Sequence, residues 1–144
     1  EGFHVSLIPF QRGNDDIILR RIERSLNSHR VKLLDNLSYK ELMAEIASSK
    51  LFLGMRLHGL IFSSILEKPF IGLSYDPKVS IFSKKLGQVC FEDLNNITLD
   101  SLIKEFNRVY SNIEDYKEVL SKNVEEIFQL NHINEDVLRK LIQN

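Results

Sequence analysis

The sequence predicts an α/β fold: a Rossmann-like parallel sheet of about five strands flanked by helices, followed by a helical C-terminal tail. Three observations support this prediction. Short apolar runs alternate with stretches whose apolar residues recur at helical spacing. The connections between them are short, which favours right-handed parallel units. From Thr98 onward, every pattern is helical.

Length and composition are those of one ordinary globular domain, so we expect residues 1–144 to form a single domain. The 19 basic and 20 acidic residues give a net charge of −1, which is not typical of a nucleic-acid-binding protein. The single cysteine, Cys90, excludes an internal disulfide and a cysteine-cluster metal site. We expect it to pack as a small apolar residue.

No apolar run approaches the length of a membrane span, and no basic-then-apolar leader is present, so we expect a cytoplasmic protein. The chain starts at Glu1, without Met and already at a strand, which we interpret as a piece cut from a longer protein. It contains no repeat, no low-complexity tract and no linker long enough to divide it.

The first strand and helix come from residues 3–26. Residues 3–10 are mostly apolar and should form a strand that is buried on both faces at the centre of the sheet. A polar loop follows, and Asn14 or Asp15 can cap the next helix. The apolar positions of this helix are Ile17, Ile18, Ile22 and Leu26.

The second strand and helix come from residues 31–48. Residues 31–34 form a short strand. Ser38, with Glu41 three residues later, gives the capping-box pattern that opens a helix. The inner positions of this helix are Leu42, Met43, Ile46 and Ala47.

Three more strands follow. Residues 51–53 and 70–73 are apolar runs, joined by a helix over 60–66. A helix over 79–86 ends at Gly87, a typical residue after a helix C-terminus, and residues 89–91 form the fifth strand. If the third strand lies on the other side of the first, the strand order is 2-1-3-4-5.

The tail is helical. One helix carries Leu102, Ile103, Phe106 and Val109, and a longer one carries Ile113, Tyr116, Leu120, Val124, Ile127 and Phe128. We expect residues 131–134 to break the helix before a last short one. Its apolar stripe is Val137, Leu138 and Leu141, and we expect this helix either to be mobile or to pack on a neighbour.

Several familiar sites are absent from the sequence. It has no glycine-rich dinucleotide or P-loop motif, no nucleophile elbow and no histidines at metal-ligand spacing. What remains is Arg56, His58 and Lys78, which follow the third and fourth strands. Ligands of parallel sheets bind outside the carboxyl ends of the strands. In an extended chain, Arg56 and His58 would point to one side, where they and a helix N-terminus could bind a small multiply charged anion.

Each residue also has a structural interpretation. Arg56 could pair with Asp76, Lys78 could be a solvated residue at a helix start, and His58 could cap a helix. Tyr75 could be either a pocket wall or a half-buried core aromatic. Taken together at two adjacent strand ends, the residues favour the functional interpretation.

Two segments resemble a known family. Residues 55–62 read Met-Arg-Leu-His-Gly-Leu-Ile-Phe, and residues 68–79 read Lys-Pro-Phe-Ile-Gly-Leu-Ser-Tyr-Asp-Pro-Lys-Val. At this separation they resemble the polysaccharide pyruvyl transferase family. The resemblance covers residues 5–90 and implies a two-domain, glycosyltransferase-B-like architecture with this chain as its C-terminal half.

The resemblance also implies an activity. Family members transfer the enolpyruvyl group of phosphoenolpyruvate to two sugar hydroxyls, giving a ketal on a cell-surface or secreted polysaccharide, with a glycan or lipid-linked sugar as acceptor. No cofactor or metal is implied.

Carried over to this chain, Arg56 would bind the donor, Lys78 would neutralise its charge and His58 would be the general acid. Tyr75 and Asp76 would complete the substrate site. Without an N-terminal domain, the chain should bind the donor weakly and turn over nothing.

Two alternatives stay open. The chain could be the nucleotide-sugar-binding domain of a glycosyltransferase, since the same basic edge would suit a diphosphate. It could also be a non-catalytic binding domain in which Arg56, His58 and Lys78 are structural.

Overall fold

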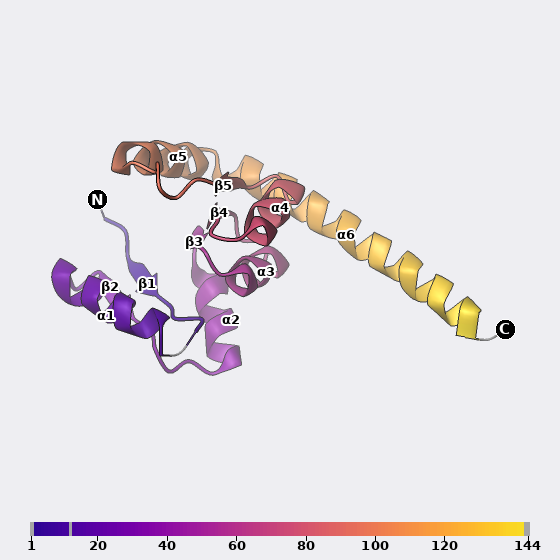
Figure 1. Ribbon diagram of the computed structural model, residues 1–144, viewed down its shortest axis with the longest axis horizontal. Helices are drawn as coiled ribbons and strands as arrows, with labels where there is room; N and C mark the ends of the chain where they lie inside the picture. The colour runs from indigo at the N-terminus through magenta and orange to yellow at the C-terminus, as the bar shows by residue number, and fades with distance from the viewer. Residues whose placement is uncertain (1, 12, 143–144) are drawn as a thin grey trace. The chain divides into compact units, whose positions relative to one another are not determined.

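The computed structural model describes residues 2–11 and 13–142, with side chains described as far as Gln129 (Figure 1). The chain divides into two compact units, Glu1–Glu45 and Ile46–Asn144. Its elements are β1 (Val5–Leu7), α1 (Asp15–Leu26), β2 (Val31–Leu33), α2 (Tyr39–Ser48), β3 (Phe52–Gly54), α3 (Leu57–Ile65), β4 (Phe70–Leu73), α4 (Pro77–Lys85), β5 (Val89–Phe91), α5 (Leu99–Ser111) and α6 (Ile113–Ile142). The α/β class and the helical C-terminal region are confirmed.

The first unit contains a parallel pair of strands, in which Val5 of β1 lies opposite Val31 of β2. The predicted burial of the first strand on both faces is not observed, because Val5 is 43 % exposed. The expected apolar positions of α1, including Ile17 and Ile18, are exposed as well. The helix itself is present, from Asp15 to Leu26, but its predicted apolar side is not buried.

The residues that were expected to cap α1 act differently. Asn14 occupies the N-cap position, but its side chain makes no capping hydrogen bond. The Asp15 carboxylate instead accepts hydrogen bonds from the backbone N–H groups of Phe10 and Gln11, at 3.1 and 2.9 Å. Asp15 therefore closes the loop that leads into the helix.

The capping box at the start of α2 is confirmed. The Ser38 backbone N–H and hydroxyl donate to the Glu41 carboxylate at 2.8 and 2.6 Å, and the Glu41 backbone N–H donates to Ser38 Oγ at 3.3 Å. The hydrogen bond from the Ser38 side chain, followed by the one from its backbone, lowers the pKa of Glu41. A local pattern of two residues thus fixes where this helix begins.

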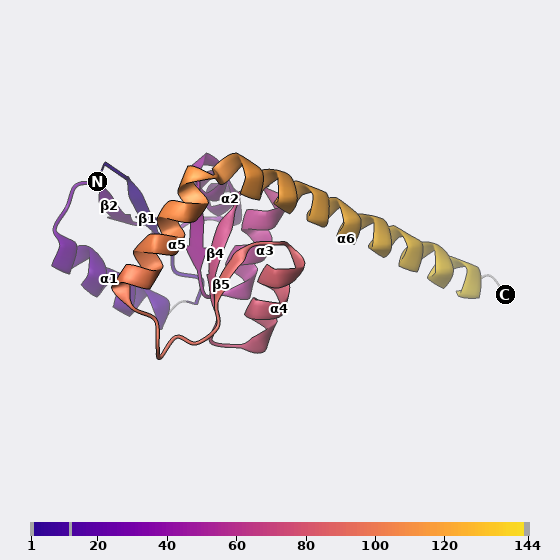
Figure 2. The same cartoon turned by 90° about the horizontal axis from the view of Figure 1, so that it is seen from above.

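The second unit contains a three-stranded parallel sheet in the order β3-β4-β5 (Figure 2). β4 and β5 have the predicted bounds, and β3 begins one residue later than predicted. The strand pairs of the described residues are β1–β2, β3–β4 and β4–β5, which agree with those neighbours in the predicted order. The predicted pairing of the first strand with the third is not among them.

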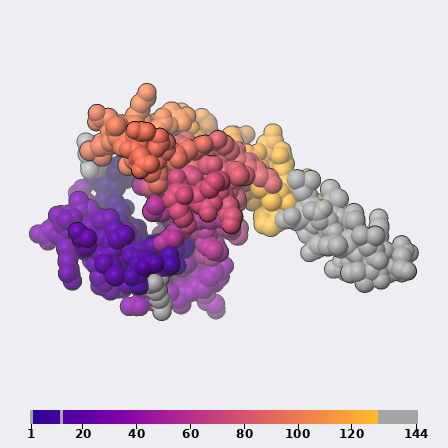
Figure 3. Space-filling model, in the orientation of Figure 1, coloured from indigo at the N-terminus to yellow at the C-terminus, as the bar shows by residue number. Residues whose placement is uncertain are grey.

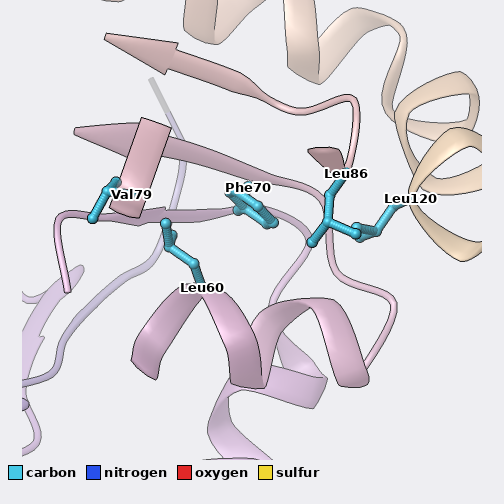
Figure 4. Packing of buried hydrophobic residues seen from close by; sticks show 5 residues of the cluster. All are labelled: Leu60, Phe70, Val79, Leu86 and Leu120. Atoms are coloured by element: carbon cyan, nitrogen blue, oxygen red, sulfur yellow. The ribbon is translucent and has the colours of Figure 1, made fainter. Parts of the chain in front are cut away.

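The core of the second unit lies between the sheet and its helices (Figure 4). The Phe82 ring of α4 stacks on the ring of Phe70, with the centroids 6.1 Å apart. Cys90 packs against this cluster as predicted, and burial raises the pKa of its thiol. The fully buried members are Leu60, Phe70, Val79, Leu86 and Leu120.

The amino ends of β4 and β5 are closed by α6. Gln88, which precedes β5, is buried, and its Oε1 accepts from the Phe70 backbone N–H at 3.2 Å. Its Nε2 donates to the backbone carbonyls of Leu86 and Tyr116, at 3.3 and 3.0 Å. One buried side chain therefore joins both strands and α6 at the edge of the sheet opposite to the carboxyl ends.

α3 and α4 end in the same way. After α3, the N–H of Glu67 bonds to Ser64 O and that of Lys68 to Ser63 O; after α4, Gly87 and Gln88 repeat the pattern. This is the Schellman motif, whose residue after the cap has a positive φ. The φ values are 53° for Glu67 and 68° for Gly87, which confirms the predicted role of Gly87.

The tail consists of α5 and α6. Thr98 and Ser101 form a capping box at the start of α5. The predicted break at 131–134 is wrong, because α6 is continuous from Ile113 to Ile142. Asparagine costs a helix only about 0.7 kcal/mol relative to alanine, which a long helix tolerates. The side chains of Val137, Leu138 and Leu141 lie outside the described residues. In the part of the chain that the structure describes, no helix has the length and apolar character needed to cross a membrane.

Candidate active site

Two helix N-termini lie at the carboxyl edge of the three-stranded sheet. Gly54, the last residue of β3, is opposite Gly72 of β4, so both strands end at the same edge. α3 begins after Arg56 and α4 begins after Asp76, and each of these residues is the N-cap of its helix. The predicted site residues therefore lie in, or directly before, the first turns of two helices that start at one edge.

The start of α3 differs from the prediction. The Arg56 carbonyl accepts from the N–H groups of Gly59 and Leu60, at 2.9 and 3.3 Å, so the helix begins at Leu57 rather than Leu60. Arg56 has extended backbone angles, whereas His58 is already helical. The expectation that the two side chains share one side of an extended chain is therefore wrong. The His58 side chain is exposed in the first turn.

Arg56 contacts Tyr75 across the two strand ends. Arg56 Nη1 donates to Tyr75 Oη at 3.5 Å, and the guanidinium carbon lies 5.7 Å from the centroid of the Tyr75 ring. Tyr75 is 56 % exposed, which excludes the core-aromatic interpretation. This contact joins the polar segment after β3 to the one after β4.

Asp76 caps α4. Its Oδ1 accepts from the Lys78 backbone N–H at 2.8 Å, and Pro77 fills the first helical position. Sequence analysis identified Asp76 as a substrate-binding candidate, but it did not identify this capping bond.

The buried residue Ser74 was also missed. Its N–H donates to Phe91 O at 2.8 Å and its Oγ donates to the Asp76 carbonyl at 2.9 Å. A serine directly after an apolar strand was the available signal. Together, Ser74 and Asp76 fix the backbone on both sides of Tyr75.

The edge has a positive character. Lys78 is exposed in the first turn of α4, His58 is exposed in the first turn of α3, and Arg56 lies before α3. Helix N-termini carry about half a positive charge each. At the start of α4, Pro77 has no N–H and Asp76 accepts from the Lys78 N–H, so Lys78 contributes there through its side chain. The arrangement suits an anion that bears more than one charge, with an imidazole in the adjacent turn.

Two other features of the described residues bear on where a site could lie. No group of three or more His, Cys, Asp or Glu residues in the described part of the chain could hold a metal ion. A cavity of about 490 Å³ lies beside β5, and none of the predicted site residues lines it. Its charged residues pair with each other, Lys84 with Glu92 and Glu105 with Arg108, both at 2.5 Å.

A comparison with known protein families gives a match. A family model described as polysaccharide pyruvyl transferase matches residues 1–77 of the 144. This range contains Arg56, His58, Tyr75 and Asp76 and ends one residue before Lys78. Neither the curated proteins nor the solved structures gave a match.

Proposed function

This chain belongs to the polysaccharide pyruvyl transferase family, and on that basis we propose that it binds phosphoenolpyruvate for transfer of pyruvate to a sugar. The acceptor would be a glycan or lipid-linked sugar of a cell-surface or secreted polysaccharide. The observation that carries the proposal is the cationic carboxyl edge of the sheet, with Arg56 and Lys78 at two helix starts and His58 exposed beside them. Phosphoenolpyruvate carries a carboxylate and a phosphate, so its charge matches this edge.

The proposed roles follow from the chemistry of the donor. Arg56 binds the carboxylate or the phosphate, and Lys78 neutralises the remaining charge. His58 donates a proton to the methylene carbon, and the electron pair of the carbon–carbon double bond forms the new C–H bond. The adjacent carbon becomes electrophilic and is attacked by one sugar hydroxyl, which loses its proton to the now neutral His58 imidazole. Attack by a second hydroxyl, whose proton leaves with the departing phosphate, completes the ketal.

The first test is binding. Calorimetry should measure tighter binding of phosphoenolpyruvate than of UDP or GDP, the ligands of a nucleotide-sugar transferase. Arg56→Ala should weaken binding at least tenfold, as expected for about 1.5–3 kcal/mol of charge-assisted hydrogen bonding, and Arg56→Lys should not restore a bidentate contact. Lys78→Ala should weaken it less.

Lys85→Ala is the matched control for Lys78→Ala, since Lys85 is exposed at the opposite end of α4. Tighter binding of UDP or GDP than of phosphoenolpyruvate would favour the nucleotide-sugar alternative. Binding of none of these anions would favour a structural role for the basic residues.

The second test is turnover by the full-length protein. His58→Ala should lower the rate by about 10²–10⁴-fold while leaving donor affinity nearly unchanged, because a general acid acts in the transition state. The measurement is phosphate release with the sugar acceptor under saturating donor. A nearly fully active His58→Ala variant would contradict the proposed role.

A further inference from the structure

We propose that Tyr75 is a positioning residue, which holds the Arg56 guanidinium in the orientation that receives the donor anion. This inference rests on the proposed function, and it adds a role for a residue that would act through Arg56 and not by touching the donor. The observation behind it is the contact between the two side chains at the ends of neighbouring strands.

The contact has two parts. The guanidinium carbon is 5.7 Å from the ring centroid, within the distance of about 6 Å at which a cation is attracted by an aromatic face. Nη1 is also 3.5 Å from the phenol oxygen, a long and therefore weak hydrogen bond. The ring should consequently contribute more to the orientation of Arg56 than the hydroxyl does.

The Tyr75 backbone is fixed on both sides. Ser74 is buried and its N–H bonds to the Phe91 carbonyl of β5, at 2.8 Å. Asp76 is held as the N-cap of α4, and its carbonyl accepts from Ser74 Oγ at 2.9 Å. A tyrosine has few rotatable bonds, so this segment presents its ring as a rigid surface.

An arginine side chain is less rigid than that of a tyrosine. The Arg56 carbonyl accepts two helical hydrogen bonds, which hold its backbone, whereas an arginine side chain has many rotamers to lose when it is ordered. A guanidinium that is ordered before the ligand arrives loses less freedom on binding. The contact uses Nη1, one of several donor groups on the fork.

The experiment measures the order of Arg56 and the affinity for donor separately. In Tyr75→Leu, NMR order parameters of the Arg56 Nε–Hε group should fall and the dissociation constant for phosphoenolpyruvate should rise three- to tenfold. Tyr75→Phe should keep both within twofold, since the ring is retained. In an Arg56→Ala background, Tyr75→Leu should have no further effect on affinity.

Tyr110→Leu is the matched control, because Tyr110 is a partly buried tyrosine of α5 that stacks on Phe106. It should leave both measurements unchanged. Unaltered order of Arg56 in Tyr75→Leu would overturn the inference, as would a loss of affinity that adds fully to that of Arg56→Ala. If the wild type does not bind phosphoenolpyruvate but Tyr75→Leu loosens Arg56, the positioning contact stands and the proposed function fails.

Discussion

At the scale of single residues, Asp76 at the carboxyl edge has an observed structural role beside the site role predicted for it. Asp76 was a candidate for substrate binding, and the structure gives it a hydrogen bond to the Lys78 N–H at 2.8 Å. An N-cap carboxylate accepts a hydrogen bond from a backbone N–H, and its negative charge interacts favourably with the positive end of the helix dipole. By holding the first turn of α4, Asp76 also fixes the backbone from which Lys78 extends.

Substitution of Asp76 separates the two roles. Asp76→Ala should lower the free energy of unfolding by about 1 kcal/mol through loss of the cap, whereas Asp76→Asn, which caps a helix nearly as well, should lower it much less. The measurement is urea denaturation followed by circular dichroism.

The same two variants should be titrated with phosphoenolpyruvate. If Asp76 only caps the helix, Asp76→Asn should bind the donor as the wild type does. A stable Asp76→Asn variant with clearly altered affinity would instead assign the carboxylate to the donor site.

At the scale of helices and strands, α3 and α4 both end in a Schellman motif, but a different residue occupies the left-handed position in each. Glu67 follows α3 with φ 53° and Gly87 follows α4 with φ 68°. A left-handed conformation costs a residue with a Cβ about 1–2 kcal/mol. Replacing that residue with glycine removes this cost, but it also gives the unfolded chain more conformational entropy, which offsets part of the gain. Glu67→Gly should therefore stabilise the protein by about 0.5 kcal/mol.

Gly87→Ala is the converse experiment. An added Cβ would lie 2.5 Å from Val119 Cγ1 of α6, so the strain of the positive φ adds to a steric clash. We expect a loss of more than about 1 kcal/mol, read from the urea midpoint at unchanged slope. If Glu67→Gly destabilises and Gly87→Ala does not, the two helix ends are not held by the motif described.

The elements that were predicted correctly are those whose signals lie in residues close together in the sequence. The Ser38–Glu41 capping box, the Gly87 helix end and the runs that form β4 and β5 are local signals. The start of α3 was missed because its N-cap is Arg56, whose side chain makes no capping bond and so leaves no signal.

The candidate site was predictable as a set of residues but not as a geometry. That Arg56 and His58 follow one strand and Lys78 follows the next can be read from the sequence. The contact of Arg56 with Tyr75, 19 residues away, depends on strand register and on where two helices begin. The burial of the first strand was overestimated because an apolar run does not specify which surfaces cover it.

At the scale of the whole molecule, the two compact units differ in their interiors. Among the side chains that the structure describes, the fully buried apolar residues all belong to Ile46–Asn144. The first unit has its own strand pair and helix, but no apolar residue in Glu1–Glu45 reaches that burial. Since stability within a protein follows local burial, the units should differ in their resistance to local opening.

Amide hydrogen exchange can measure this difference. Amides of β4 and β5 should exchange more slowly than those of β1 and β2, because core residues such as Phe70 and Ile71 lie in the second unit. Leu120→Ala removes a fully buried side chain from this core and should cost about 2–5 kcal/mol. Protection should fall in β4 and β5 and change little in β1 and β2.

The neighbouring Val119 provides the control, because it is 43 % exposed and its truncation leaves the buried cluster intact. Val119→Ala should change protection in β4 and β5 far less than Leu120→Ala does. If Leu120→Ala lowered protection equally in all four strands, the two units would unfold as one cooperative body. If β1 and β2 exchanged as slowly as β4 and β5 in the wild type, the difference in burial would not determine the stability of the units.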